Sequence, residues 1–454
     1  MTRNSRSFVA RMAGLFSPRL PQLDDAVVKR LVVSCLERRG RFLECAQVHG
    51  SPLYVIDTEA LRLKGQKFLR AFSERLPNFQ AYYAMKSNSH PRLAATLVEV
   101  GLGLDVSSGV ELKAALASEA RRLVFSGPGK TADELTLAVQ NAERVTVLID
   151  SLAELHKLDQ QAALGGVKVR AGVRLTTDDH GLWRKFGIPL DSLSSFFEAA
   201  DNCRNIRLCG LQFHLSWNMN ADPHVRFLAK LGKRLNQMTA DRRRSIEFLD
   251  IGGGFWPAEG EWLQAAATPR GMLQTALDNS PGKYNERFHR PAAAIEEFAL
   301  YISNAIKKYI PADMSPAVYA EPGRWLCQEA MHILVRVVDR KADDIVITDG
   351  GTNAVGWERF ESDFFPVVNL SRPSTSEQKC LVAGSLCTPH DIWGYSYFGD
   401  DIRPGDTLLI PCQGAYTYSL RQEFIKPLPN CAEIPRTKSE SVETPSEPIA
   451  CRPK

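Results

Sequence analysis

The stretch Phe79-Gln-Ala-Tyr-Tyr-Ala-Met-Lys-Ser-Asn-Ser89 joins the pattern of a buried strand to a lysine. Its apolar and aromatic residues 81–85 predict a strand in the interior. Lys86 follows directly, where a parallel α/β barrel presents its catalytic groups. Because most lysines are solvated surface residues, Lys86 alone would not identify a site. The residues that follow other predicted strands make it the first candidate for chemistry.

Strand-like runs alternate with helix-like stretches on both sides of this segment. The runs number eight, which is the number that closes a TIM barrel, and the stretches between the first seven are long enough for crossover helices. Ser108 and Glu111 fit a capping box at the start of one such helix. The predicted strands are residues 81–85, 103–106, 123–125, 145–149, 167–174, 208–214, 248–251 and 318–320.

The pattern changes after Trp325, where strand-like runs are separated by turn residues with little helix signal. We therefore predict an α/β fold, a TIM barrel followed by an all-β domain. Residues 24–39 predict an amphipathic helix and residues 51–57 a short strand that enters the main domain. The expected domains are a basic leader and helix that partly joins the β domain (1–50), the barrel (51–328), the β domain (329–428) and a disordered, Pro/Ser/Thr/Glu-rich tail (429–454). The strands expected in the β domain are 331–339, 344–348, 378–383 and 406–411.

Composition excludes several classes of function. The 56 basic and 52 acidic residues give a net charge of only +4, so no global field would attract nucleic acid, and a small-molecule partner is expected. The 10 cysteines include no CxxC pair, which argues against a zinc site or a disulfide framework. No apolar run is long enough for a membrane span, so we expect a cytoplasmic protein. The basic leader admits an organelle-targeting helix or, more simply, a solvated helix that packs on the body.

Polar residues gather at the carboxyl ends of the predicted barrel strands, which form the active face of such barrels. The loops after the last two strands offer bare glycine amides and a guanidinium, which suit a phosphate. A lysine and a phosphate site on one face predict pyridoxal phosphate. The residues at these positions are Lys86, Asp105, His214, Gly252, Gly253, Gly254, Glu321 and Arg324.

The chemistry of that cofactor makes three further demands. A carboxylate must face the pyridine nitrogen, and Glu321 can do this. The ring needs a flat partner, which His214 can be. The substrate carbon needs a proton donor after bond breaking, and the thiol of Cys387 can supply it.

Six ordered motifs resemble those of the fold-type III pyridoxal-phosphate decarboxylases, which include the ornithine, arginine, diaminopimelate and carboxynorspermidine decarboxylases. The resemblance covers residues 51–428. The motifs are Tyr83-Ala-Met-Lys-Ser-Asn88, Gly103-Leu-Asp-Val-Ser-Ser108, Gly210-Leu-Gln-Phe-His214, Asp250-Ile-Gly-Gly-Gly-Phe255, Glu321-Pro-Gly-Arg324 and Gly414-Ala-Tyr416.

This resemblance implies a head-to-tail homodimer with two shared active sites. Lys86 would be the Schiff-base lysine supported by Asp105, and Cys387 would reach the substrate from the neighbouring subunit. His214 would stack on the ring and Glu321 would face its nitrogen. The phosphate would be held by Gly252, Gly253, Gly254, Arg324 and Tyr416, and an acidic position near the distal end of the substrate matches Asp349.

Departures from the family pattern bear on the substrate. Thr388 follows Cys387 where relatives carry an acid, although Asp391 matches a later acidic position. Losing one carboxylate beside a partly buried cation costs roughly 2 to 5 kcal/mol, so a plain diamine precursor is disfavoured. The pattern is nearest to the branch for siderophore and antibiotic assembly, whose substrates include carrier-linked and citrate-linked amino acids.

Two further positions carry expectations about contacts. Trp217 stands where relatives place a serine near the phosphate, and Ser216 is the nearest candidate to replace it. Arg359 lies where the family builds its specificity pocket, within a charged run that also suits a solvated face.

The sequence thus predicts decarboxylation of an amino acid or amino-acid conjugate to an amine and carbon dioxide. One alternative is an amino-acid racemase or epimerase, because the same cofactor acidifies the same carbon. The other is a non-catalytic relative that regulates an active paralogue. The presence of Lys86, Glu321, Arg324 and Cys387 in one chain argues against the second.

Overall fold

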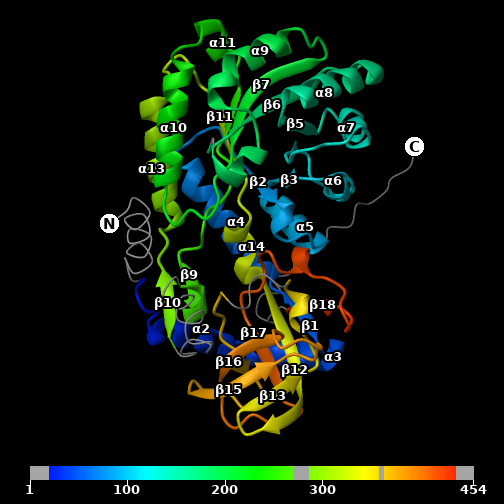
Figure 1. Cartoon of the computed structure of the whole chain (residues 1–454), viewed down its shortest axis with the longest axis vertical. Coiled ribbons are helices and arrows are strands. Elements are labelled where there is room, and N and C mark those ends of the chain that lie inside the picture. The colour runs from blue at the N-terminus through cyan, green and yellow to red at the C-terminus, as the bar shows by residue number, and fades with distance from the viewer. Residues whose placement is uncertain (1–19, 179, 269–285, 357–361, 436–454) are drawn as a thin grey trace, which may run out of the picture.

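The computed structural model describes residues 20–178, 180–268, 286–356 and 362–435. A closed barrel occupies the upper half of Figure 1 and a second β sheet the lower half, with the short helix α14 (Arg324–Cys327) between them. The predicted TIM barrel followed by a β domain is confirmed. The basic leader lies outside the described residues.

Eight parallel strands close the barrel in the order β11-β2-β3-β4-β5-β6-β7-β8. The ring is closed by β11, the last of these strands in the chain, because it pairs with both β2 and β8. Each of the eight predicted strands is present. Their bounds are β2 (Phe79–Ala84), β3 (Gly103–Val106), β4 (Leu123–Phe125), β5 (Val145–Ile149), β6 (Val169–Leu175), β7 (Ile206–Phe213), β8 (Phe248–Asp250) and β11 (Ala317–Ala320).

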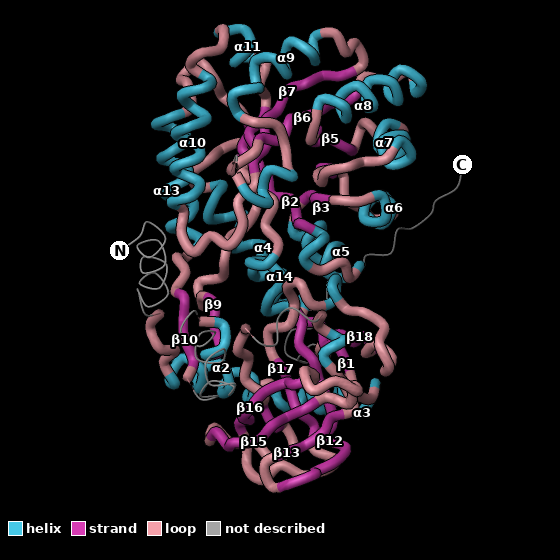
Figure 2. The backbone as a smooth tube through the Cα atoms, viewed as in Figure 1, coloured by secondary structure: helices cyan, strands magenta, loops and turns pink. Residues whose placement is uncertain are grey.

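Helices surround these strands on the outside of the barrel (Figure 2). At the predicted start of α6, Ser108 Oγ accepts the backbone N–H of Glu111 at 3.2 Å, which confirms the N-cap. The Glu111 carboxylate accepts the N–H of Ser107 at 2.7 Å, one residue earlier than in a capping box. The helices are α4 (Thr58–Ser73), α5 (Pro91–Val100), α6 (Gly109–Leu116), α7 (Ala132–Val139), α8 (Leu152–Gly165), α9 (Leu193–Asp201), α10 (Asp222–Leu235), α11 (Ala240–Arg244) and α13 (Ile295–Tyr309).

Alternation along the strands fills the barrel in layers, because residues two apart on a strand face the same side. The ring of Phe248 occupies the middle of the barrel in a cluster with Tyr82 and Tyr319. Gly210 leaves room for it, since a Cβ there would lie 2.0 Å from the Phe248 ring. Several of these strands carry a polar side chain of the candidate site two residues further along. The candidate site is therefore the layer next to this apolar one.

The second sheet contains eight strands in the order β13-β15-β16-β14-β17-β12-β1-β18. The four strands predicted after the barrel are β12 (Met331–Ala342), β13 (Ile345–Thr348), β15 (Glu377–Ala383) and β17 (Thr407–Ile410). The sequence reading missed β14 (Val368–Asn369), which has only two residues, and β16 (Ile392–Phe398). Gly394 interrupts the apolar pattern of β16, so the run does not stand out.

Two predicted domain boundaries were wrong. The strand at 51–57, β1 (Leu53–Ile56), was expected to open the barrel domain, but it pairs antiparallel with β12 in the second sheet. The tail expected to be disordered from residue 429 begins with β18 (Asn430–Glu433), which pairs in parallel with β1. Composition misses such a strand because backbone hydrogen bonds hold it, including Ile434 N–H to Ile56 O at 2.9 Å. Residues 436–454 lie outside the described part of the chain.

The amino-terminal helices cover the second sheet rather than the barrel. Helix α2 (Asp25–Glu37) matches the predicted amphipathic helix and is capped by the Asp24 side chain; α3 (Arg39–His49) follows it. Their apolar residues Val32 and Phe42 share a core with Leu334 and Leu409 of the sheet.

A hairpin inserted after β8 ties the two halves together. Strands β9 (Glu261–Gln264) and β10 (Arg287–Arg290) pair antiparallel, and β9 also bonds to the β domain through Gln264 N–H to Ser362 O at 2.9 Å. The barrel mouth and the β domain are therefore held in a fixed relation on this side.

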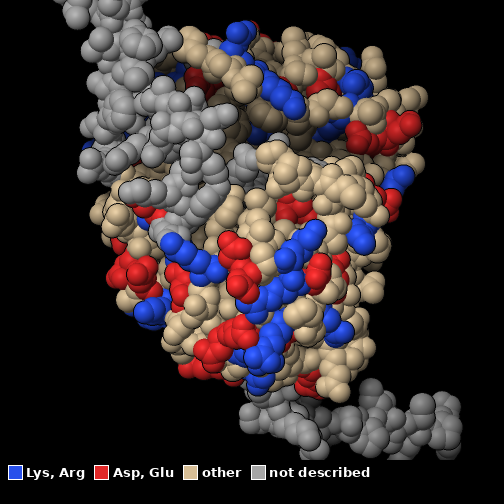
Figure 3. Space-filling model, turned by 60° about the horizontal axis from the view of Figure 1, so that its bottom comes forward, with Lys and Arg blue, Asp and Glu red and all other residues tan. Residues whose placement is uncertain are grey.

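Acidic and basic side chains are interspersed over the face of the β domain seen in Figure 3. Within the described ranges, none of the helices is both long and apolar enough to cross a membrane.

Candidate active site

Lys86 sits in a 3-10 turn, η1 (Met85–Ser87), directly after β2, so its side chain rises from the carboxyl end of the barrel. Its Nζ donates to Asp105 Oδ2 at 2.7 Å, and Asp105 is fully buried at the end of β3. Ser126, after β4, donates to the other oxygen of Asp105 at 2.5 Å. Three neighbouring strands therefore hold the amine by way of one carboxylate.

The electrostatic environment keeps this lysine protonated in the absence of a ligand. Burial alone would lower the pKa of Lys86, but the carboxylates of Asp105 and Glu321 outweigh it and raise that pKa above its ordinary value of 10.5. A lysine in this state must lose its proton before it can attack a carbonyl carbon. A neighbouring ionised carboxylate is suited to stabilise the charged form and to accept that proton.

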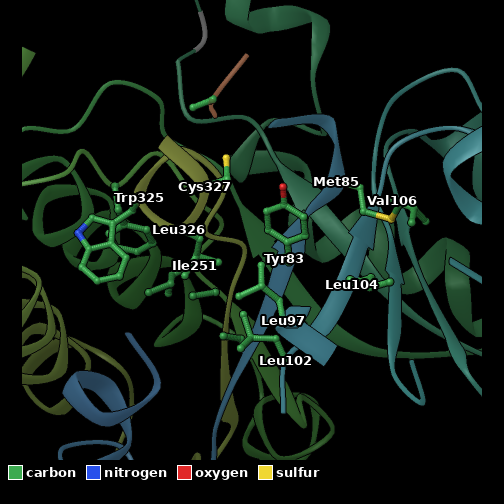
Figure 4. Close-up of a cluster of buried hydrophobic side chains, with 14 of the residues drawn as sticks. Tyr83, Met85, Leu97, Leu102, Leu104, Val106, Ile251, Trp325, Leu326 and Cys327 are labelled. Atoms are coloured by element: carbon green, nitrogen blue, oxygen red, sulfur yellow. The ribbon is translucent and has the colours of Figure 1, made fainter. Parts of the chain in front are cut away.

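The turn that carries Lys86 rests on packed side chains. Figure 4 shows the side chains of Tyr83 and Cys327 close to each other, one from β2 and the other from α14. Tyr83 Oη donates to Asn88 O at 2.8 Å, and Cys327 Sγ donates to Ser87 Oγ at 3.4 Å. The turn is thereby fixed from the barrel side and from the connection to the β domain.

Glu321 and His214 lie together on the side of Lys86 away from Asp105, because β11 and β3 flank β2 on its two sides. Glu321, just after β11, is 2% exposed, and its Oε2 is 3.6 Å from His214 Nδ1. Gln212 on β7 donates its Nε2–H to both Glu321 oxygens at 3.3 and 3.4 Å. Burial would raise the pKa of Glu321, but the contact with His214 and the charge of Lys86 lower it to about 2. Glu321 is therefore an ionised carboxylate inside the barrel.

His214 is neutral in this environment. Burial lowers the pKa of its imidazole below 6.5 despite the neighbouring Glu321. Its Nδ1 accepts the N–H of Gly253 at 3.2 Å, and its Nε2 lies 3.2 Å from Ser216 Oγ. The ring is thus oriented by the glycine loop at one nitrogen and by Ser216 at the other.

The glycine loop after β8 allows backbone to approach backbone. Gly252 and Gly254 have φ of 67° and 81°, in the left-handed region that favours glycine. A Cβ on Gly253 would lie 2.3 Å from Glu321 O, and one on Gly254 would lie 1.8 Å from Leu215 O. Gly252 and Gly254 are therefore required by their backbone conformation, and Gly253 and Gly254 by the lack of space for a Cβ.

Arg324 and Tyr416 flank the same end of the barrel. The guanidinium of Arg324 lies 4.3 Å from the ring centre of Trp256 and 5.1 Å from that of Tyr416. Tyr416 belongs to the loop after β17 of the second sheet and bonds through its N–H to Ser87 O at 2.7 Å. The β domain therefore contributes to the site, and the predicted residues 86, 324 and 416 meet.

These residues enclose a cavity of about 600 Å³. Predicted residues on its wall are Lys86, His214, Ser216, Gly254, Glu321, Arg324 and Tyr416. Sequence reasoning missed Ser126, Arg174, Gln212, Asp250 and Trp256, which lie on the wall or directly behind it. The alternation of strand residues was a usable signal for four of them, because each lies two positions from an inward-facing residue.

The described residues expected to act on or contact the substrate, Cys387, Asp391 and Asp349, are not on this wall. Cys387 is exposed on a loop of the β domain. Asp391 is buried, and its two oxygens accept the N–H groups of Thr352 at 2.7 Å and Leu386 at 2.6 Å. Asp349 accepts from Ser51 Oγ at 2.5 Å and from Arg336 N–H at 2.8 Å. Arg359 lies outside the described residues.

The residues at the barrel end fit pyridoxal phosphate by their chemistry. An amine at Lys86 suits an aldehyde, and an ionised Glu321 suits a protonated pyridine nitrogen. The glycine cradle, which any Cβ would fill, and the Arg324 guanidinium suit a phosphate. The flat ring of His214 lies between these groups, in contact with both Glu321 and Gly253.

Comparison with known proteins gives consistent matches. The family model described as "Pyridoxal-dependent decarboxylase, pyridoxal binding domain" matches residues 65–328. The diaminopimelate decarboxylase of Aquifex aeolicus is 26% identical over 412 residues, which cover 86% of this chain and 88% of the relative.

A second relative comes from Staphylococcus aureus and bears the name 2-[(L-alanin-3-ylcarbamoyl)methyl]-2-hydroxybutanedioate decarboxylase. It is 25% identical over 425 residues, which cover 87% of this chain and 97% of the relative. The crystal structure of diaminopimelate decarboxylase from M. jannaschii has a TM-score of 0.72 at 23% identity, with 86% of this chain and 88% of the other covered. The structural match shows that the fold is shared.

Proposed function

This chain belongs to the pyridoxal-dependent decarboxylases, and from that premise we propose how its own residues divide the work of decarboxylating an amino acid. Its cofactor is pyridoxal phosphate. When bound, that cofactor withdraws electrons from the substrate Cα, so that a bond to this carbon can break. The observation that carries the assignment of roles is the convergence of Lys86, Glu321 and the glycine loop on one cavity.

Lys86 binds the cofactor aldehyde through its amine in this proposal, and Asp105 holds that amine in place. Glu321 keeps a proton on the pyridine nitrogen, because an ionised carboxylate stabilises the cation beside it. His214 would face the ring of the cofactor as a neutral imidazole that brings no competing charge. The Arg324 guanidinium and the Gly254 N–H would bind the phosphate, because the N–H groups of Gly252 and Gly253 already donate to Asp250 and His214.

Ser216 does not replace the phosphate-binding serine of the relatives in this arrangement. Its hydroxyl lies 3.2 Å from His214 Nε2, so its role is to orient the imidazole. Trp217 has a φ of 52° and is 61% exposed at the mouth of the cavity. A tryptophan in that position adds an apolar surface where the relatives have a hydroxyl.

Cys387 returns the proton to the substrate carbon from a neighbouring subunit. Within one chain its thiol is exposed on a β-domain loop and does not line the cavity, so a second copy is needed to bring a thiol to Lys86. Large apolar side chains lie exposed around the cavity mouth, as expected of a surface that another subunit covers. They are Trp183, Trp217 and Leu420.

The substrate does not end in a bare ammonium group. Asp391 and Asp349 are the two acids offered for such a group, and the oxygens of both already accept hydrogen bonds within the chain. A buried cation needs a carboxylate partner, and Thr388 cannot supply one. We therefore favour an amino acid with a large or conjugated side chain, including a citrate-linked one of the kind in the name of the S. aureus relative.

The test is to purify the protein with pyridoxal phosphate, record its visible absorption, and measure carbon dioxide release from a panel of amino acids and citryl-amino acids. A cofactor band that disappears in Lys86→Ala, with carbon dioxide from a conjugated compound, is the expected result. Turnover of ornithine or lysine in preference to every conjugate would contradict the substrate proposal. A cofactor band that survives in Lys86→Ala would contradict the role of that lysine.

A further inference from the structure

Asp250 is a buried carboxyl group that the proposed mechanism does not use. It ends β8 and is 0% exposed. It stands in register with Gln212 on β7 and with Tyr319 on β11, so it lies two residues across from Glu321. Two carboxyl groups thus end neighbouring strands at the carboxyl end of the barrel, where both are buried.

The hydrogen bonds of Asp250 leave one oxygen without a donor. Its Oδ1 accepts the N–H of Gly252 at 2.9 Å. Among the described residues no donor reaches Oδ2, and Gln212 Oε1 is likewise a buried acceptor without a donor. A buried carboxylate oxygen that lacks a donor is unfavourable. A proton on Asp250 removes the deficit at Oδ2, because that atom then donates.

The charges around the site require the same proton. Lys86 and Arg174 are the cations that lower the pKa of Glu321, while the guanidinium of Arg324 lies beside the rings of Trp256 and Tyr416. Glu321 and Asp105 are the titratable groups with the largest effect on the pKa of Asp250, and neither is a cation. A third carboxylate would therefore lie uncompensated in the interior, which is strongly disfavoured.

The two carboxyls differ in what stabilises their ionised forms. Glu321 has His214, Lys86 and Arg174 near it and receives both bonds from Gln212. Asp250 has one backbone N–H, and burial with the charge of Glu321 raises its pKa well above 3.8. When two acids share a site, the proton stays on the one with less support for its charge.

We propose that Asp250 is a neutral carboxylic acid that donates a hydrogen bond to Glu321. This buried acid pair holds Glu321 in position and in its ionised form. Asp250 is in this account a positioning residue, since it acts through Glu321. Its protonation does not depend on the proposed function, whereas its effect on activity rests on the role of Glu321 given above.

The first measurement is infrared spectroscopy of the cofactor-free protein at neutral pH, which reports the carbonyl stretch of protonated carboxylic acids. The wild type should show such a band, and Asp250→Asn should lack it. Glu321→Gln, which changes the acceptor, should shift the band and serves if the first variant does not fold. A wild-type spectrum unchanged by both substitutions would overturn the proposal without touching the assigned function.

The second measurement compares two buried aspartates at strand ends. Asp250→Asn keeps a hydrogen-bond donor beside Glu321, whereas Asp250→Ala removes it, so the alanine variant should lose about 10- to 100-fold in kcat/KM as supporting residues do. Asparagine should recover most of that loss at 250 but not at 105, where the aspartate must be ionised to bind Lys86. Equal losses in Asp250→Asn and Asp250→Ala would contradict a neutral acid.

Discussion

The barrel end around Lys86 and the β-domain loop around Cys387 differ in burial and in hydrogen bonding. The first is buried, connected by short hydrogen bonds between neighbouring strands, and complete within one chain. The second is exposed, and Asp391, four residues after Cys387, accepts hydrogen bonds from backbone N–H groups. Under the proposed function, cofactor binding would be preorganised within one chain, while proton return would depend on assembly.

Removal of the lysine should have the largest effect. Lys86→Ala deletes the amine that holds the cofactor, so kcat should fall by at least about 10³-fold, as expected for a group that forms a covalent bond with the cofactor. The measurement is carbon dioxide release under saturating substrate together with the absorption spectrum. Residual activity within tenfold of wild type would mean that Lys86 lowers the activation barrier by no more than about 1.4 kcal/mol. That result would contradict the role of the barrel end in this comparison.

Removal of the thiol should separate the two regions. Cys387→Ala should lower kcat by about 10²- to 10⁴-fold, the usual range for a group that transfers a proton. Because the loop is remote from the cavity of the same chain, cofactor affinity and the absorption band should be unchanged from wild type. Cys431→Ala, at a half-buried cysteine elsewhere in the β domain, is the matched control. Loss of the cofactor band in Cys387→Ala alone would show that the loop is part of the cofactor site.

Removal of a glycine should test how tightly the barrel end is packed. Gly254→Ala adds a Cβ 1.8 Å from Leu215 O at a positive φ, and should cost more than about 3 kcal/mol of stability through the backbone clash. Gly166→Ala has a similar φ of 63° but open space around it, so it should cost only about 1 kcal/mol. Thermal or urea unfolding of the two variants gives the difference. Equal costs would mean that the loop yields and is not a rigid cradle.

The smallest effect concerns the pH dependence of stability at Asp250. Burial raises its pKa well above 3.8, so it favours the folded state below that value and loses this contribution as pH rises through the folded-state pKa. Asp250→Asn cannot ionise, so its unfolding free energy relative to wild type should increase from acidic to alkaline pH. A difference that stays flat or falls over that range would indicate an ionised Asp250.

Sequence reading reached the strands and the residues that follow them, and its limits are physical. Periodicity located every barrel strand, and the carboxyl-end rule located Lys86, His214 and Glu321. It could not assign β18, whose stability comes from backbone pairing with β1 rather than from apolar side chains. Nor could it show that Asp391 is occupied, because its partners are backbone N–H groups. Asp250 was quoted within a motif, but its protonation depends on neighbours from other strands.

The most direct test of the division between the two regions mixes two inactive variants. Lys86→Ala and Cys387→Ala subunits are each purified with pyridoxal phosphate, mixed, allowed to exchange, and assayed for carbon dioxide release. In a mixed dimer one of the two sites has both an intact lysine and an intact thiol from the other chain, so random exchange should restore about a quarter of wild-type activity. No activity above that of the separate variants, in mixtures shown to contain mixed dimers, would place both groups on the same chain and contradict the account.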